Sequence, residues 1–390
     1  MLAPNPNFAA VFGHEPEYLF SAPGRTELSG NHTDHQHGCV LAAAINLEAL
    51  AWVAQNETRI MRVVSEGRKP IQISLDELER KPEEANHSVA LLRGVAARMT
   101  ELGAKLSGFD AYTTNSVMTG SGLSSSAAFE VLLGTVMNSL FCGGRFSPVE
   151  IAQIGQWAEN NYFGKPCGLM DQTASSVGGV SFIDFRDPAK PVVEKIDFDF
   201  SACGYTLCII DVGANHADLT NAYAAIPGEL KQVCAVFGKE YLRDVPEADF
   251  YARIGEVRKA AGDRAVLRAI HIYEENKRVI RQVECLKRGD FTEYLRLMRA
   301  SGLSSLLYLQ NVTPAGATDH QEAAFALALA ERLLDGEGAV RIHGGGFAGT
   351  IQAFVPNEKA EAFRAGMEAV LGAGSCHILS IRDHGGCRVK

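Results

Sequence analysis

The sequence predicts an α+β fold, and three observations carry that prediction. The chain has 390 residues, of which 46% are hydrophobic and 21% charged, the balance of a globular protein with a large core. Its length predicts two domains, because one domain usually takes roughly 150 residues. Segments typical of strands and of helices occur in both halves without strict alternation, which favours α+β over a doubly wound parallel sheet.

In the first half, strands and helices are both expected. A short apolar run indicates a strand, whereas apolar residues that recur every three to four positions indicate a helix. The helix from residue 147 is the best marked, because Ser147 and Glu150 form a capping box around Pro148. Residues 40–54 form a long apolar stretch that is interrupted by Asn46 and Glu48. The expected strands cover residues 59–73 (with a turn at 66–67) and 109–118, and the expected helices cover residues 86–102, 124–141 and 147–161.

The second half is expected to begin with a strand and to continue with a long helical section. A glycine pair at residues 178–179 marks the expected break between two domains, residues 1–178 and residues 179–390. The expected elements are a strand over 205–212, helices over about 219–302, two strands joined by a glycine turn over 338–355, a helix over 358–371 and a last strand over 377–381.

Composition excludes several classes of protein. Lys and Arg number 37 and Asp and Glu 46, a net charge of −9, so the basic face of a non-specific nucleic-acid binder is not expected. Nine cysteines, an odd number without a C-x-x-C pair, argue against a disulfide scaffold or a structural zinc site and fit reduced thiols. No signal peptide is visible, and no apolar run approaches the roughly 18 residues of a membrane span. We therefore expect a cytoplasmic protein without membrane or nucleic-acid partners.

One glycine-rich segment has the character of an anion site. Residues 119–128 read TGSGLSSSAA, with an expected strand before them and an apolar helix after them. Glycines let the backbone approach a ligand, and free N–H groups at a helix N-terminus attract anions. The segment is neither a Walker A loop, since no Lys follows the glycines, nor a dinucleotide fingerprint, since the spacing differs. The simpler alternative is an N-cap serine on a glycine turn.

Three further segments carry polar groups that could belong to a site. Residues 21–38 are densely polar and include three histidines, although their spacing matches no familiar metal motif. Residues 341–350 contain a run of glycines that a turn between strands would also explain. Asp171 lies among small and apolar residues, which makes it a candidate buried carboxylate or, alternatively, a helix cap.

Taken in order, these segments resemble the GHMP sugar and metabolite kinases, and most closely their galactokinase branch. The motifs are SAPGR followed by GNHTDHQHG, then GSGLSSSAA, CGLMDQ and HGGGFAGT, and the likeness extends from about residue 10 to residue 355. It implies a two-domain fold: an N-terminal domain like that of ribosomal protein S5, with a left-handed βαβ unit, and a C-terminal ferredoxin-like domain. The active site would lie in the cleft between them.

The resemblance also implies a reaction and a role for individual residues. The reaction would be ATP-dependent phosphorylation of a sugar at its anomeric hydroxyl, with Asp171 as the base and Arg25 as its cationic partner. Mg²⁺ would be held by Ser126 and Glu159, oxygen ligands suited to a hard cation. The implied sugar contacts are Asn31, His32, Asp34, Gly168 and Tyr223. The implied phosphate loop consists of Gly120, Ser121, Gly122, Leu123, Ser124, Ser125 and Ser126. The partners would be ATP and a small sugar, and a monomer is favoured.

Three positions depart from the galactokinase pattern. Asn31 stands where the family has a Glu that contacts the sugar 6-hydroxyl, His35 stands where it has Tyr, and Ser88 stands where it has an adenine-side Trp. The expected product is α-D-galactose 1-phosphate. The alternatives are a kinase for a modified galactose, such as galacturonate or N-acetylgalactosamine, and a sensor without catalysis. The sensor is disfavoured because the small residues after Ser126 are intact, as is Asp171.

Overall fold

The structure is a computed structural model that describes residues 5–118, 122–165, 167–213, 220–347 and 349–390. No helix within these ranges is both long and apolar enough to cross a membrane. The elements up to residue 196 are α1 (Pro6–Phe12), β1 (Tyr18–Ser29), β2 (Cys39–Gln55), β3 (Ile60–Ser65), β4 (Ile71–Ser74), α2 (Ser88–Glu101), β5 (Phe109–Asn115), α3 (Ser125–Phe141), α4 (Pro148–Ala158), α5 (Met170–Val177), β6 (Val180–Asp184) and β7 (Val192–Ile196).

The remaining elements are mostly helical. They are β8 (Tyr205–Asp211), α6 (Thr220–Ala235), α7 (Glu247–Ala252), α8 (Ile254–Ala261), α9 (Asp263–Arg288), α10 (Phe291–Ser304), α11 (Glu322–Leu334), β9 (Ala339–His343), β10 (Thr350–Pro356), α12 (Ala360–Leu371), β11 (Cys376–Leu379) and β12 (Cys387–Arg388). The chain also forms short helical turns, among them η1 (Asp34–Gln36), η3 (Glu159–Phe163) and η5 (Ser305–Leu309).

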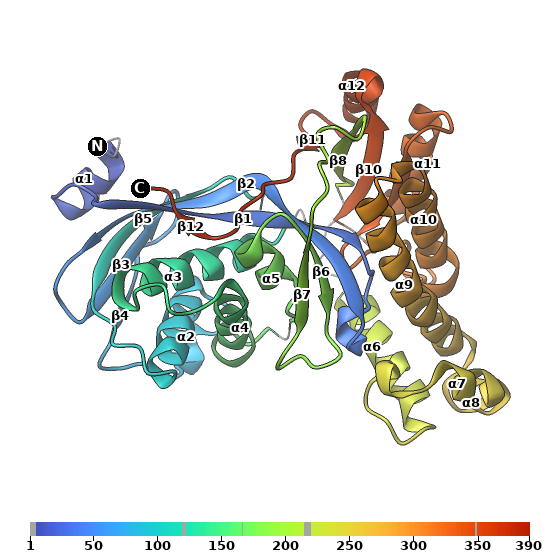
Figure 1. The fold of residues 1–390 in the computed structure, drawn as a ribbon, viewed down its shortest axis with the longest axis horizontal. Helices are drawn as coiled ribbons and strands as arrows, with labels where there is room; N and C mark the ends of the chain where they lie inside the picture. The colour runs from blue at the N-terminus through green and yellow to red at the C-terminus, as the bar shows by residue number, and fades with distance from the viewer. Residues whose placement is uncertain (1–4, 119–121, 166, 214–219, 348) are drawn as a thin grey trace.

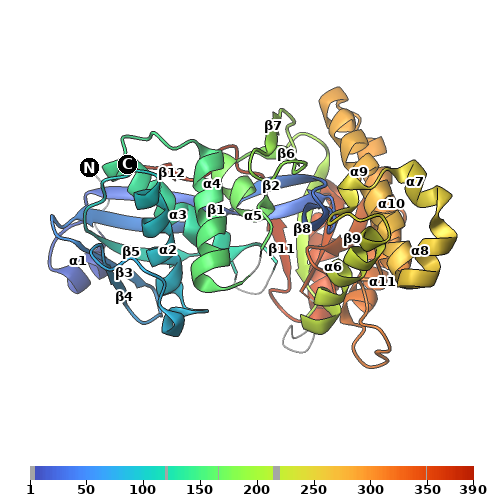
Figure 2. The same cartoon turned by 90° about the horizontal axis from the view of Figure 1, so that it is seen from below.

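The larger sheet is organised around two long strands. Its order is β12-β1-β2-β5-β3-β4, and β6 pairs with both β2 and β7. Helices α2 to α5 pack below this sheet (Figure 1) and lie in front of it when the molecule is seen from below (Figure 2). One face of the sheet is covered by these helices (Figure 1), and β1 is buried throughout residues 20–29 despite its polar composition. The long strands β1 and β2 run from this sheet toward α9 (Figure 1).

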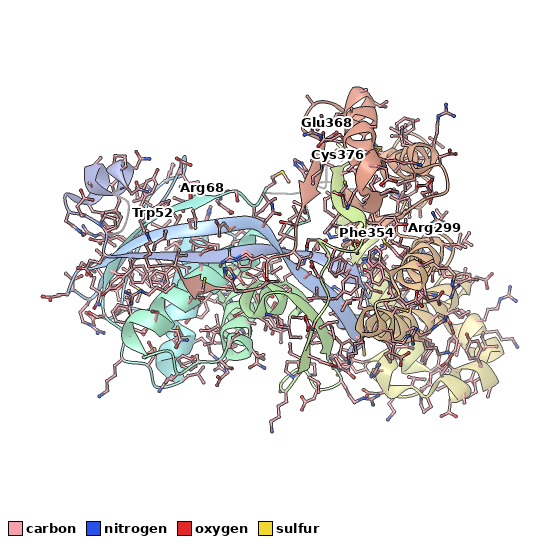
Figure 3. The ribbon with its side chains drawn as sticks, turned by 45° about the horizontal axis from the view of Figure 1, so that its top comes forward. Trp52, Arg68, Arg299, Phe354, Glu368 and Cys376 are labelled. Carbon is pink, nitrogen blue, oxygen red and sulfur yellow. The ribbon has the colours of Figure 1, made fainter. Side chains whose placement is uncertain are left out.

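The smaller sheet belongs to the other end of the molecule. It is antiparallel in the order β11-β8-β10-β9 and lies beside the helices α9 to α12 (Figure 1). Phe354 of β10, labelled in Figure 3, packs its ring edge-on against Phe291 and Tyr294 of α10. Such aromatic contacts add to apolar burial and fix the sheet against the helices.

The α+β class is confirmed, and most of the expected elements are present. The capping box at Ser147 forms as predicted, with its hydroxyl accepting from Glu150 N and the Glu150 carboxylate accepting from Ser147 N. The prediction missed α1, α5, α11, β6, β7, β12 and the strand character of β1 and β2. Polar residues in a buried strand do not show the apolar run that the prediction relied on.

The division into residues 1–178 and 179–390 stays a prediction. Strands β6 and β7 follow residue 179 and pair within the larger sheet, and β12, near the chain end, pairs with β1. The predicted βαβ unit has a counterpart in β3 and β5, which are parallel and are connected through α2. The left hand of that connection also stays a prediction.

Candidate active site

A cavity of about 320 Å³ brings the predicted motifs together. It is bordered by β1, η1, the segment before α5, α6 and the glycine turn between β9 and β10. These segments are far apart in the sequence, so no single motif could identify the cavity. The lining residues are Arg25, Glu27, His32, Asp34, His35, Gly122, Lys165, Cys167, Gly168, Met170, Asp171, Tyr223, His343, Gly344, Gly345, Gly346, Gly349 and Thr350.

Asp171 and Arg25 form an ion pair at one end of this cavity. Both the Nε and an Nη of Arg25 lie 2.8 Å from Asp171 Oδ1, and the Ser124 hydroxyl donates to Oδ2 at 2.5 Å. Burial raises the pKa of Asp171, but Arg25 and Ser124 outweigh it and hold the pKa below its usual value. Asp171 is therefore an ionised carboxylate that faces the cavity. Asp171 bonds to the side chains of Arg25 and Ser124, and it does not cap α5, whose N-cap residue is Leu169.

Four of the five predicted sugar contacts line the cavity. His32 bonds through Nε2 to Gly345 O at 2.9 Å, and His35 bonds through Nε2 to the Tyr223 hydroxyl at 3.0 Å. Asp34 is fixed because its Oδ1 accepts from the backbone N–H of His35 at 2.9 Å. Gly168 lies directly against the Asp34 carboxylate. These contacts join residues 32–35 to α6, to the glycine turn and to Gly168, so four chain segments shape this part of the cavity.

The fifth predicted contact, Asn31, lies elsewhere. It is fully buried, and it is absent from the cavity lining. Its Nδ2 donates to Gly344 O and, at 3.3 Å, to Glu27 Oε1, while its Oδ1 accepts from Asn311 Nδ2 at 2.8 Å. Because both ends of the amide are used within the protein, Asn31 supports the cavity wall from behind. Glu27, for which no role was predicted, lines the cavity instead.

The close approach of Gly168 to Asp34 yields a testable prediction. A Cβ at residue 168 would collide with Asp34 Oδ2. Overpacking of this kind costs roughly 1–3 kcal/mol, so we expect Gly168→Ala to raise the KM for the sugar by about tenfold. The matched control is Gly255→Ala in α8, where a Cβ meets nothing within 4 Å. Unchanged KM in Gly168→Ala, measured beside this control, would contradict the assigned contact.

The described part of the phosphate loop leads into α3. Ser124 has φ +61° and precedes the helix, which begins at Ser125. Leu123 is fully buried, and its carbonyl accepts from Arg25 N at 3.1 Å, so its side chain belongs to the core. Gly122 lines the first cavity. Gly120 and Ser121, which were predicted to contact phosphate, lie outside the described residues.

A second cavity of about 400 Å³ lies on the other side of the start of α3. Ser125 and Ser126 line it, together with Ser88 of α2 and Arg68, which is labelled in Figure 3. Ser124 contacts Asp171 in the first cavity, and the next two residues line the second. The N-terminus of α3, where free N–H groups favour anions, therefore separates the two cavities.

Glu159 and Ser126 fit the predicted magnesium site. The Ser126 Oγ lies 3.5 Å from Glu159 Oε1, and Glu159 is only 3% exposed. The π-helical turn η3 follows α4 at this residue, and Gln172 Nε2 donates to Glu159 Oε2 at 2.9 Å. Two oxygen ligands suit Mg²⁺, which usually retains several waters, and Ser126 lines the second cavity. Among the described residues, no cluster of three or more His, Cys, Asp or Glu side chains could hold a metal.

A second carboxylate, Glu130, lies behind Glu159. Gln172 Nε2 also donates to Glu130 Oε2 at 2.9 Å, so one amide bridges the two acids. Glu130 is fully buried, and this burial together with the charge of Glu159 raises its pKa well above the usual value. Burial thus favours the neutral form of Glu130.

His32 gives the free energy of unfolding a dependence on pH. Burial and the neighbouring His35 lower the pKa of His32 from 6.5 to about 3. Between these values the unfolded chain binds more protons than the folded one, so the free energy of unfolding falls as pH falls. We expect His32→Gln to reduce the loss between pH 7 and pH 5 by about 2 kcal/mol, measured by urea unfolding. The control is His320→Gln, at an exposed position; an unaltered pH dependence in His32→Gln would contradict the assignment.

Comparison with known proteins identifies the family of this site. The model of the GHMP kinases N terminal domain matches residues 90–179, and the galactokinase galactose-binding signature matches residues 6–55. The chain is 34% identical to a galactokinase of Streptomyces coelicolor, over 77% of this chain and 76% of that protein. It is 33% identical to a galactokinase of Actinobacillus pleuropneumoniae serotype 3, over 92% and 90% of the two chains.

Solved structures agree. The Lactococcus lactis galactokinase complexed with galactose superposes with a TM-score of 0.81 at 27% identity, covering 97% of each chain. A mevalonate kinase superposes with a TM-score of 0.67 at 14% identity, covering 94% of this chain and all of that one, which supports the shared fold alone. Together with the paired Arg25 and Asp171 in the cavity, these similarities establish that the chain belongs to the galactokinase family of the GHMP kinases.

Proposed function

We propose that this protein transfers the γ-phosphoryl group of ATP to the anomeric hydroxyl of galactose and releases α-D-galactose 1-phosphate and ADP. The observation that carries the proposal is the position of Asp171, an ionised carboxylate at the end of the first cavity and one hydrogen bond from the start of α3. In this arrangement the sugar occupies the first cavity and the nucleotide the second. The N-terminus of α3 lies where the phosphates would cross from one cavity to the other.

The chemistry proposed for the chain is proton transfer and charge stabilisation. Asp171 accepts the proton of the sugar 1-hydroxyl as that oxygen attacks the γ-phosphorus, and the O–P bond to ADP breaks. Arg25 keeps Asp171 ionised and offsets negative charge on the transferring group. Ser126 and Glu159 would hold Mg²⁺, which neutralises phosphate charge when it is bound. A monomeric state and a cytoplasmic location remain predictions.

The test is a galactose-dependent ADP-release assay on the purified protein, with the product identified by phosphorus NMR. We expect ADP release that requires both galactose and Mg²⁺ and yields a sugar 1-phosphate. A panel that includes galacturonate and N-acetylgalactosamine addresses the modified-sugar alternatives. Binding of both ligands without turnover would instead support the sensor.

A further inference from the structure

Glu27 is a buried carboxylate that faces the sugar cavity and has no role in the reaction described above. It lies on β1 two residues after Arg25, and the two are paired with β2 in an uninterrupted register, so they share one face of the strand. Only 3% of the residue is exposed. A carboxylate this deeply buried needs partners, because an isolated buried charge is costly.

Within the part of the chain that the structure describes, the partners of Glu27 engage only one of its two oxygens. Oε1 accepts from Arg341 Nη2 at 2.8 Å and from Asn31 Nδ2 at 3.3 Å. Among the described residues no hydrogen bond reaches Oε2. This oxygen is also not among the side-chain atoms that are both fully enclosed and without a partner, so it retains some exposure. Since Glu27 lines the cavity, a ligand hydroxyl there can supply the missing donor.

Asn31 cannot take this role in the arrangement shown. The galactokinase pattern has a glutamate at that position, whereas here the Asn31 amide is consumed by Gly344, Glu27 and Asn311. Asn31 and Glu27 are in direct contact, so the amide and the acid belong to one network. The carboxylate expected at residue 31 is thus provided from four residues earlier.

We propose that Glu27 accepts a hydrogen bond from the hydroxyl at the C6 end of the sugar and thereby selects galactose over sugars that lack this hydroxyl or carry a carboxylate there. Alternate residues of a strand are roughly 7 Å apart, a span comparable with one pyranose ring. Arg25 holds Asp171 at the anomeric end, so Glu27 lies near the opposite end. The inference rests on the proposed function, because it assumes that galactose occupies this cavity.

The test compares galactose with 6-deoxygalactose, which lacks only the hydroxyl in question. Hydrogen bonds to charged groups contribute enough for a roughly 10- to 100-fold preference. We expect the ratio of kcat/KM for galactose to that for 6-deoxygalactose to fall about tenfold or more in Glu27→Gln, mainly through KM. Galacturonate should be a poor substrate of the wild type, because its carboxylate would face Glu27.

A matched control separates recognition from folding. Glu275 is also fully buried and paired with an arginine, Arg278, at 2.7 Å, but it does not line the cavity. Glu275→Gln should lower the unfolding temperature and leave the ratio for the two sugars unaltered. Should Glu27→Gln fail to fold, Glu27→Asp keeps the charge opposite Arg341 while withdrawing it by one methylene, and the ratio should still fall.

The outcomes separate this inference from the proposed function. A wild type that does not phosphorylate galactose would overturn the proposed function. The inference is wrong if galactose is phosphorylated but the ratio of kcat/KM for galactose to that for 6-deoxygalactose is unchanged in the Glu27 variants that fold. It is also wrong if galacturonate is preferred over galactose. In either case Glu27 does not recognise the C6 end of the sugar.

Discussion

Asp171→Asn is expected to lower kcat by about 10²–10⁴-fold, the usual contribution of a positioned base. The amide cannot accept the proton of the sugar hydroxyl, although it can keep a hydrogen bond to Ser124. Binding of ATP, measured by calorimetry, should change little, because Asp171 and its partner Arg25 line the first cavity, whereas the nucleotide is proposed to occupy the second. The measurement is steady-state ADP release with saturating galactose and Mg²⁺.

The matched control is Asp184→Asn. Asp184 is likewise paired with an arginine, since Arg243 Nη2 lies 3.0 Å from its Oδ2, but it does not line the cavity. This control should lose some stability and keep its turnover. An Asp171→Asn variant that retains more than a tenth of wild-type turnover would exclude the role of base.

Much of the site could be predicted because its motifs are local in sequence. Arg25 and Asp171 are 146 positions apart, yet each is embedded in a recognisable motif, and their contact follows from the family fold. The capping box at Ser147 could be predicted equally well, since its residues and the backbone groups that they bond lie within one helical turn. For this cap the signal is local, and the structure agrees with the prediction.

The remainder could not be predicted because it depends on tertiary contacts. The direction in which Asn31 points is decided by Asn311 and Gly344, which are about 300 positions away in the chain. Glu27 could have been noticed as an acid two residues after Arg25, but its burial follows only from the packing of β1. Leu123 lies inside the loop motif, yet its side chain belongs to the core. A motif identifies a segment, whereas the direction of each side chain is fixed by the fold.

The second large effect concerns Mg²⁺. Ser126→Ala and Glu159→Gln are each expected to raise the Mg²⁺ concentration needed for half-maximal rate by about tenfold or more, because each would remove one of the two oxygen ligands proposed for Mg²⁺. The measurement is the rate of ADP release as a function of free Mg²⁺ at fixed ATP. Glu150→Gln, in the first turn of α4, is the control, since its carboxylate only caps that helix.

A structural explanation of Glu159 makes a different prediction. Lys165 Nζ lies 3.6 Å from Glu159 Oε1, so the carboxylate could serve only as the partner of this lysine. In that case Glu159→Gln and Lys165→Met would have similar effects on stability, and neither would alter the Mg²⁺ dependence. Lys165 is largely exposed, however, and exposed ion pairs contribute little, about 0–1 kcal/mol. Lys165 is therefore a weak partner for a carboxylate that is 3% exposed beside the Ser126 hydroxyl and the Gln172 amide, and under the proposed function a bound cation would be its main partner.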